Sequence, residues 1–281
     1  MSNQDPIRLE SVSFTYPPVE EEEEATVVFN ELSLAIPTGV TTLVGPNGVG
    51  KSTLMLLAGG RLMPNSGRVL LLGEDTRQFA SDGPDPEMEA RRNQIASFVY
   101  QNMEFETEEP VGELLGYVME SGTTEGGETF LQGIKEALDL EPCLHRRTQE
   151  LSKGELQRTI IAFSLLYGSP VILMDEPVFA LEEPQKDRVF TFLMEHARAR
   201  GLTLLYSAHN IDLSAKYSDQ TLLFHKGGDV DLGPTSELFK RETLEEAFQA
   251  PYDTLYQRQN LYREVLNRIA RPGEDDSADA P

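Results

Sequence analysis

The stretch GPNGVGKST, from Gly45 to Thr53, matches a complete phosphate-binding loop pattern. It follows a short apolar segment that predicts a strand, and it opens into a segment that predicts a helix. Glycines allow backbone N–H groups to face phosphate oxygens, and a helix N-terminus favours anionic charge. We therefore expect nucleotide binding, with Lys51 reaching the β- and γ-phosphates and Ser52 ligating magnesium. A glycine-rich turn with a chance lysine is the weaker alternative, because pattern and context agree.

An acidic pair follows a second apolar segment, in the stretch VILMDEP. Asp175 and Glu176 come directly after four apolar residues, so we expect them at the carboxyl edge of a buried strand. Open α/β sheets bind their ligands at this edge. Asp175 fits a magnesium ligand, bound directly or through water. Glu176 fits the base that orients the attacking water, a role worth about 10²–10⁴-fold in rate. An acidic pair that merely caps a strand is the alternative.

A third stretch, ELSKGELQR, has the pattern of a helix start. Ser152 is placed to cap the helix, and Glu155 follows three residues later to close a capping box. Apolar residues then follow at helical spacing, from Leu156 onward. The pattern alone leaves open whether the serine has a second role.

The order of predicted elements indicates an α/β fold. The apolar strands 171–175 and 202–208 flank a helix at 184–201, which forms a βαβ unit. Such a unit implies a parallel sheet with helices on both faces. The other predicted strands are 7–16, 26–37, 41–45 and 67–73, and the other predicted helices are 51–60, 111–120, 129–140, 154–167, 236–249 and 254–270.

The net charge of the chain is −23, which argues against nucleic acid and anionic lipid as direct partners. Cys143 is the single cysteine, so no intrachain disulfide can form, and a reducing compartment is expected. The polar N-terminus lacks the apolar core of a signal peptide. Each apolar run is too short to span a bilayer. We expect a soluble protein, or one held at a membrane by something other than its own segments.

The three motifs stand in the order found in the ATP-binding cassette (ABC) ATPases, and the chain resembles that family over nearly its whole length. Gly45–Thr53 resembles the Walker A motif, Leu151–Glu155 the family signature, and Val171–Glu176 the Walker B motif with its catalytic glutamate. The resemblance implies a P-loop NTPase core with a mixed sheet and an antiparallel β edge. It also implies an inserted α-helical subdomain and C-terminal helices.

The resemblance assigns roles to individual residues. It implies that Tyr16 stacks on adenine, that Gln101 links magnesium to a transmembrane partner, and that His209 contacts the γ-phosphate. The catalytic residues would be Lys51, Glu176 and His209, and the magnesium ligands Ser52, Gln101 and Asp175. The implied nucleotide-binding residues are Tyr16, Gly45, Pro46, Asn47, Gly48, Gly50, Lys51, Ser52, Thr53, Gln101, Ser152 and Gly154. Taken singly, Tyr16 could be an edge-strand aromatic, Gln101 a surface residue and His209 a buried structural histidine.

The resemblance also implies a domain plan and partners. We expect an ATPase domain at 1–234 with its helical subdomain at about 101–167, a helical extension at 235–270, and a disordered tail at 271–281. In the family, the signature helix meets the ATP of a second subunit, so a homodimer is expected. Separate permease subunits would hold the dimer at the inner face of the cell membrane, with a substrate-binding protein acting through the permease. The C-terminal segment is similar to importer ATPases for metal chelates, which suggests that class of cargo.

Other members of the family remain as alternatives. An exporter subunit, a soluble ATPase acting on DNA or ribosomes, and a regulatory cassette without turnover are all possible classes. The negative charge and the compact insert argue against the soluble class, and retention of Lys51, Glu176 and His209 argues against the regulatory class. Two positions depart from the family pattern: Lys153 replaces a signature glycine, and Glu182 replaces an aspartate. An acidic insert, Glu20–Glu24, is expected to form a solvated loop.

Overall fold

A computed structural model describes residues 5–18, 24–80, 83, 85–101, 103–124, 126–208 and 210–255 of the chain. Its largest feature is a six-stranded sheet in the order β10-β9-β3-β8-β7-β6. All neighbouring pairs in this sheet are parallel except β9 with β10, which is antiparallel. The strands are β3 (Gly39–Val44), β6 (Ala96–Val99), β7 (Val171–Asp175), β8 (Thr203–Ser207), β9 (Gln220–Phe224) and β10 (Val230–Pro234). The predicted parallel sheet is therefore confirmed.

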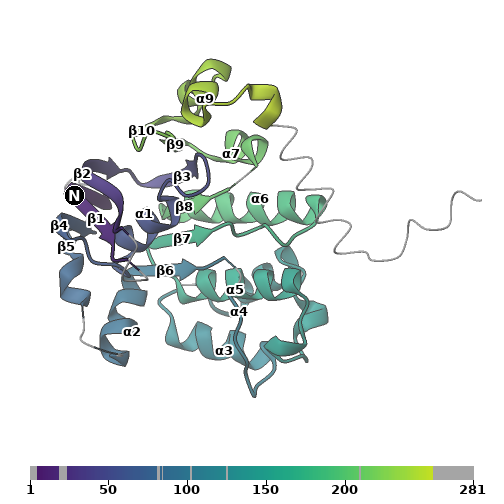
Figure 1. Cartoon of the computed structure of the whole chain (residues 1–281). Helices are drawn as coiled ribbons and strands as arrows, with labels where there is room; N and C mark the ends of the chain where they lie inside the picture. Colours follow the sequence, from purple (N-terminus) through teal and green to yellow (C-terminus); the bar gives the residue numbers. More distant parts are fainter. Residues whose placement is uncertain are drawn as a thin grey trace, which may run out of the picture.

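A second sheet of four antiparallel strands, β2-β1-β4-β5, forms the predicted antiparallel edge of the fold. Helix α1 (Lys51–Ala58) contacts strands of both sheets (Figure 1). Its buried face includes Leu54 and Leu57, which belong to the apolar core that the two sheets share. The strands are β1 (Ile7–Tyr16), β2 (Thr26–Ile36), β4 (Ser66–Leu71) and β5 (Glu74–Asp75). Alternating burial along β1 explains why its bounds could be predicted from the sequence.

Three α-helices of the described residues lie between β6 and β7 in the sequence, and they gather at the end of the molecule opposite α9 (Arg241–Phe248) (Figure 1). They are α3 (Val111–Ser121), α4 (Gly127–Ala137) and α5 (Lys153–Tyr167). Their fully buried side chains, such as Leu115 and Ile134, join one core with Met174 of β7 and Phe190 of α6 (Glu183–Arg200). This shared core fixes α5 relative to the main sheet. The remaining helices before β9 are η1 (Thr76–Phe79), α2 (Pro86–Ile95), η2 (Glu141–Cys143), η3 (Thr148–Glu150), α6 (Glu183–Arg200) and α7 (Ile211–Tyr217).

The C-terminal region differs from the expectation of one helix at 236–249. It forms two helices, α8 (Thr235–Leu238) and α9 (Arg241–Phe248). The break falls at Lys240, which has an extended backbone and whose carbonyl accepts the N–H of Leu244 at the start of α9. The break lets Leu244 pack with Val44 in a small separate core. The second expected helix, 254–270, lies outside the described residues from 256 onward.

Among the helices of the described ranges, none combines the length and the apolar character needed to cross a bilayer.

The pairing of β1 with β4 generates the first prediction, since Gly67 in β4 has φ +79 and lies against the β1 backbone. A Cβ there would collide with the Ser11 carbonyl and lie 2.5 Å from the Glu10 oxygen. We expect Gly67→Ala to lower the free energy of unfolding by about 3 kcal/mol or more. The matched control is Gly73→Ala, since Gly73 has φ +86 but no atom lies within 4 Å of the place that its Cβ would take.

Urea denaturation of both variants measures the difference. Gly73→Ala should lose roughly 1–2 kcal/mol, the backbone cost alone. Equal losses in the two variants would show that the close approach of β4 to β1 contributes nothing.

Candidate functional site

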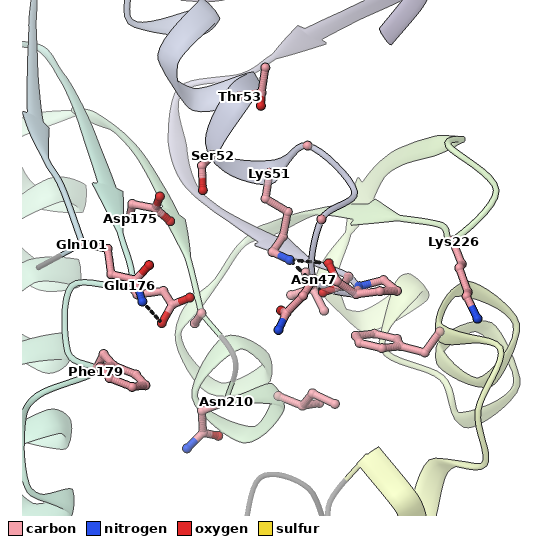
Figure 2. A pocket seen from close by; sticks show the side chains of 18 of the residues that line it. Asn47, Lys51, Ser52, Thr53, Gln101, Asp175, Glu176, Phe179, Asn210 and Lys226 are labelled. Atoms are coloured by element: carbon pink, nitrogen blue, oxygen red, sulfur yellow. Dashed lines mark hydrogen bonds between the residues drawn. The ribbon is translucent and has the colours of Figure 1, made fainter. Parts of the chain in front are cut away.

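One cavity of about 1080 Å³ opens at the carboxyl ends of β3 and β7 (Figure 2). Twelve of the predicted site residues line it together: Tyr16, Gly45, Pro46, Asn47, Gly48, Gly50, Lys51, Ser52, Thr53, Gln101, Asp175 and Glu176. They come from segments far apart in the sequence. The parallel strand order brings eleven of them to one edge of the main sheet, and Tyr16 comes from the end of β1 in the antiparallel sheet. His209 lies outside the described residues, although its neighbours Ala208 and Asn210 line the cavity.

The loop between β3 and α1 needs its glycines for two physical reasons. Gly50 is the residue before α1 and has φ 97, in the left-handed region that side chains disfavour. A Cβ on Gly50 would lie 2.6 Å from Val28 Cγ1, and one on Gly45 would lie 2.6 Å from the Phe224 carbonyl oxygen. The loop therefore packs closely against β2 and β9, and this packing leaves the N-terminus of α1 facing the cavity.

Lys51 folds back over this loop. Its Nζ donates hydrogen bonds to the carbonyl oxygens of Gly45 at 2.9 Å and Pro46 at 2.6 Å. Burial lowers the pKa of the Lys51 ammonium, while the carboxylates of Glu176 and Asp175 act in the raising direction. A cation held in a partly dry cavity beside an open helix N-terminus is well placed to bind phosphate.

The acidic pair faces the same cavity from β7. Asp175 is the last residue of that strand, and Glu176 follows with φ 49, a conformation that is uncommon for a residue other than glycine. Gln101, after β6, donates from Nε2 to Glu176 Oε2 at 3.0 Å (Figure 2). The predicted Gln101 and Glu176 are thus in direct contact on one side of the cavity.

The donor set of the cavity fits a magnesium ion that arrives with phosphate. Ser52, Gln101 and Asp175 offer one hydroxyl, one amide and one carboxylate to the same space. Magnesium commonly binds through one or two carboxylates plus substrate phosphates and water. Within the described ranges, no cluster of three or more His, Cys, Asp or Glu residues is arranged to hold a metal by itself.

Part of the cavity wall was not predicted from the sequence. Thr26 and Val28 come from β2, Lys226 follows β9, and Phe248 ends α9. No motif marks these residues, because only tertiary packing, such as that of α9 on β3 and β9, brings them to the cavity. Helical spacing could have placed Phe248 on the apolar face of α9, but not in the same cavity as Gly45.

The comparisons with known proteins agree with this geometry. A family model described as "ABC transporter" matches residues 29–179, which is more than half of the 281 residues. The chain belongs to the ABC transporter family. It is an ATP-binding subunit of that family and an ATPase. The predicted P-loop fold is likewise confirmed.

Two relatives and one solved structure illustrate this membership. The chain is 32% identical over 225 residues to the thiamine import ATP-binding protein ThiQ of Yersinia pseudotuberculosis, covering 77% of this chain and 90% of the relative. It is 34% identical to the cobalt import ATP-binding protein CbiO of Rhodobacter capsulatus, covering 70% of each chain. A dimeric post-hydrolysis structure of the ATP-binding cassette MJ0796 with ADP and Pi has the same fold, with TM-score 0.67, 24% identity and coverage of 82% and 98%.

The signature segment of this ABC subunit lies apart from its own cavity. Ser152 caps α5, because Glu155 N donates to Ser152 Oγ at 3.3 Å and Ser152 N donates to Glu155 Oε2 at 2.7 Å. The predicted capping box is confirmed. Neither Ser152 nor Gly154 lines the cavity, and Ser152 and Lys153 are exposed. The start of α5 is therefore accessible to a second molecule.

The departure at Glu182 also falls on a helix start. Glu182 is the residue before α6, and its N–H donates to Gln185 Oε1 at 3.4 Å. A carboxylate before a helix is favoured by the helix dipole, so Glu182 suits this position. Of the acidic insert, Glu24 is exposed, and Glu20 to Glu23 lie outside the described residues.

The position of Tyr16 generates the second prediction. Its side chain lines the cavity and is 37% exposed, and its hydroxyl lies 3.3 Å from Thr53 Oγ1. An exposed ring at a nucleotide cavity can stack on a base, which is worth about 1–3 kcal/mol. We expect Tyr16→Ala to raise the dissociation constant of ATP roughly tenfold or more, and Tyr16→Phe to change it little. Fluorescence titration with a labelled nucleotide measures both, and equal affinity in all three proteins would remove Tyr16 from the site.

Proposed function

We propose that this chain powers an ABC importer by hydrolysing ATP, with each active site completed by a second copy of the chain. The observation that carries the proposal is the meeting of Lys51 and Glu176 in one cavity, with Glu176 held by Gln101. A phosphate-binding cation and a carboxylate base on opposite walls are the two groups that hydrolysis of a nucleoside triphosphate requires.

The proposed chemistry divides between the two walls. Backbone N–H groups of the loop and the ammonium of Lys51 bind the phosphates, and the Glu176 carboxylate orients and polarises the attacking water. Magnesium, when bound with the nucleotide, supplies charge neutralisation, and Ser52, Gln101 and Asp175 are the residues that would hold it. His209 is proposed to contact the γ-phosphate, as its position between two cavity-lining residues supports.

The proposed dimer follows from the separation of the signature from the cavity. The capped start of α5, with Ser152 and Gly154, lies outside this chain's own site, and its Ser152 is exposed. A helix N-terminus attracts anions, so in a dimer it can meet the γ-phosphate bound by the partner subunit. The dimeric state of the MJ0796 cassette supports this arrangement for a protein of the same fold.

The direction of transport is proposed from the relatives, since those reported above are named as import proteins. Their cargoes, thiamine and cobalt, differ while their identities to this chain are similar, at 32% and 34%. Similarity of the ATPase subunit therefore does not select the cargo. A metal chelate remains the proposed class, and it rests on the C-terminal sequence pattern alone. Cargo choice is assigned to separate permease subunits and a substrate-binding protein.

Attachment to the membrane is proposed to occur through those permease subunits, at the inner face of the cell membrane. The net charge of −23 disfavours direct binding to anionic lipid. The segment around Gln101 is a suitable contact, because Gln101 is exposed and also bonded to Glu176. A permease contact there would be transmitted directly to the catalytic carboxylate.

The third prediction tests the two walls of the cavity. We expect Lys51→Ala to abolish measurable ATP binding, because the cation over the phosphate loop is lost. Glu176→Gln should bind ATP yet release phosphate at least about 10²-fold more slowly, because an amide cannot act as the base. Lys135→Ala on α4, outside the cavity lining, is the matched control and should retain both properties. Turnover of Glu176→Gln at the wild-type rate would remove Glu176 as the base.

A further inference from the structure

A buried serine lies on the strand between β3 and β7, the two strands that lead into the phosphate loop and the acidic pair. Ser207 is the last residue of β8, which lies between β3 and β7 in the sheet. In register, Ser207 is opposite Leu43 of β3 on one side and Asp175 of β7 on the other. Ser207 therefore lies at the carboxyl edge of the sheet. The phosphate loop follows β3 at this edge, and the acidic pair lies at the end of β7.

The hydroxyl of Ser207 makes two hydrogen bonds, and both go to the acidic pair. It donates to Asp175 Oδ1 at 2.5 Å and accepts the backbone N–H of Glu176 at 3.0 Å. A serine hydroxyl has one proton to donate and two lone pairs to accept with, so these roles are compatible. The bond to Asp175 is charge-assisted, and bonds of that kind are stronger than neutral ones.

The surroundings make these two bonds difficult to replace. Ser207 is 1% exposed, so bulk water does not reach the hydroxyl. The peptide that it holds belongs to Glu176, whose φ of 49 is a strained conformation. Such conformations persist only where surrounding contacts over-determine them. A hydrogen bond to the N–H of the same residue is a contact of this kind.

We propose that Ser207 is a positioning residue that sets the geometry of both Asp175 and Glu176 through one hydroxyl. It touches neither nucleotide nor water in this role; it acts through the two carboxylate-bearing residues. The inference rests on the functions proposed above for Asp175 and Glu176. Ser207, which belongs to none of the three motifs, thereby couples the proposed magnesium ligand Asp175 to the proposed base Glu176.

A matched pair of variants isolates the hydroxyl from the volume of the side chain. Ser207→Thr keeps the hydroxyl and adds a methyl group, whereas Ser207→Val has nearly the same shape without the hydroxyl. Loss of a hydrogen bond to a charged group changes an equilibrium by roughly 10- to 100-fold. We expect the kcat for ATP hydrolysis of Ser207→Val to be at least about tenfold below that of Ser207→Thr, with KM for ATP within about twofold.

A binding measurement supplies a readout that is independent of turnover. In the Glu176→Gln background, ATP binding is titrated with magnesium by calorimetry for both Ser207 variants. Groups that orient a metal-ligating carboxylate typically change metal affinity about 10–100-fold. Ser207→Val should raise the magnesium concentration at half-saturation several-fold relative to Ser207→Thr, and ATP affinity without magnesium should be equal in the two.

Melting temperatures check that the variants fold. If the larger side chains do not fit, Ser207→Ala is compared with the wild type instead, because alanine adds no atoms to the buried site. Equal kcat values and equal magnesium midpoints with and without the hydroxyl would overturn the inference. Glu176→Gln is assayed in parallel. If it turns over at the wild-type rate, the proposed function fails; if it is slow while Ser207→Ala keeps wild-type kcat, only the role of Ser207 fails.

Discussion

The parallel alignment of β3, β8 and β7 is the constraint on which the site depends. Parallel strands end at one edge of the sheet, so Leu43, Ser207 and Asp175 lie side by side there. The phosphate loop leaves the sheet at the first strand and the acidic pair at the third. Because the main-chain hydrogen bonds fix the register, a shift of one residue would turn Asp175 away from the cavity.

Charge distribution within the cavity follows from this alignment. Lys51 is a partly buried cation in a chain of net charge −23; burial lowers the pKa of its ammonium, and the nearby carboxylates of Glu176 and Asp175 offset part of this effect. Its Nζ bonds to two loop carbonyl oxygens, which hold the side chain in place. These bonds leave the N–H groups at the start of α1 available for phosphate. The loop thus presents positive potential to phosphate, while the acids stand across the cavity, where metal and water are needed.

How much the sequence could predict depends on how local each feature is. The phosphate loop, the acidic pair and the capping box at Ser152 are each set by neighbouring residues, so the sequence suffices to locate all three. The break at Lys240 and the cavity wall at Phe248 depend on packing against β3 and β9, which no local pattern encodes. Ser207 lies 31 residues from Glu176, so its role becomes visible only when the register of β7 and β8 is known.

The central claim is that one chain carries two half-sites, its own cavity and the capped start of α5 at Ser152. Light scattering coupled to size-exclusion chromatography tests this most directly, on the Glu176→Gln variant with saturating ATP and magnesium. The account predicts a stable homodimer that reverts to monomer when nucleotide is removed, or when Ser152→Arg blocks the helix start. A strictly monomeric Glu176→Gln protein, or a dimer that persists with Ser152→Arg, would contradict it.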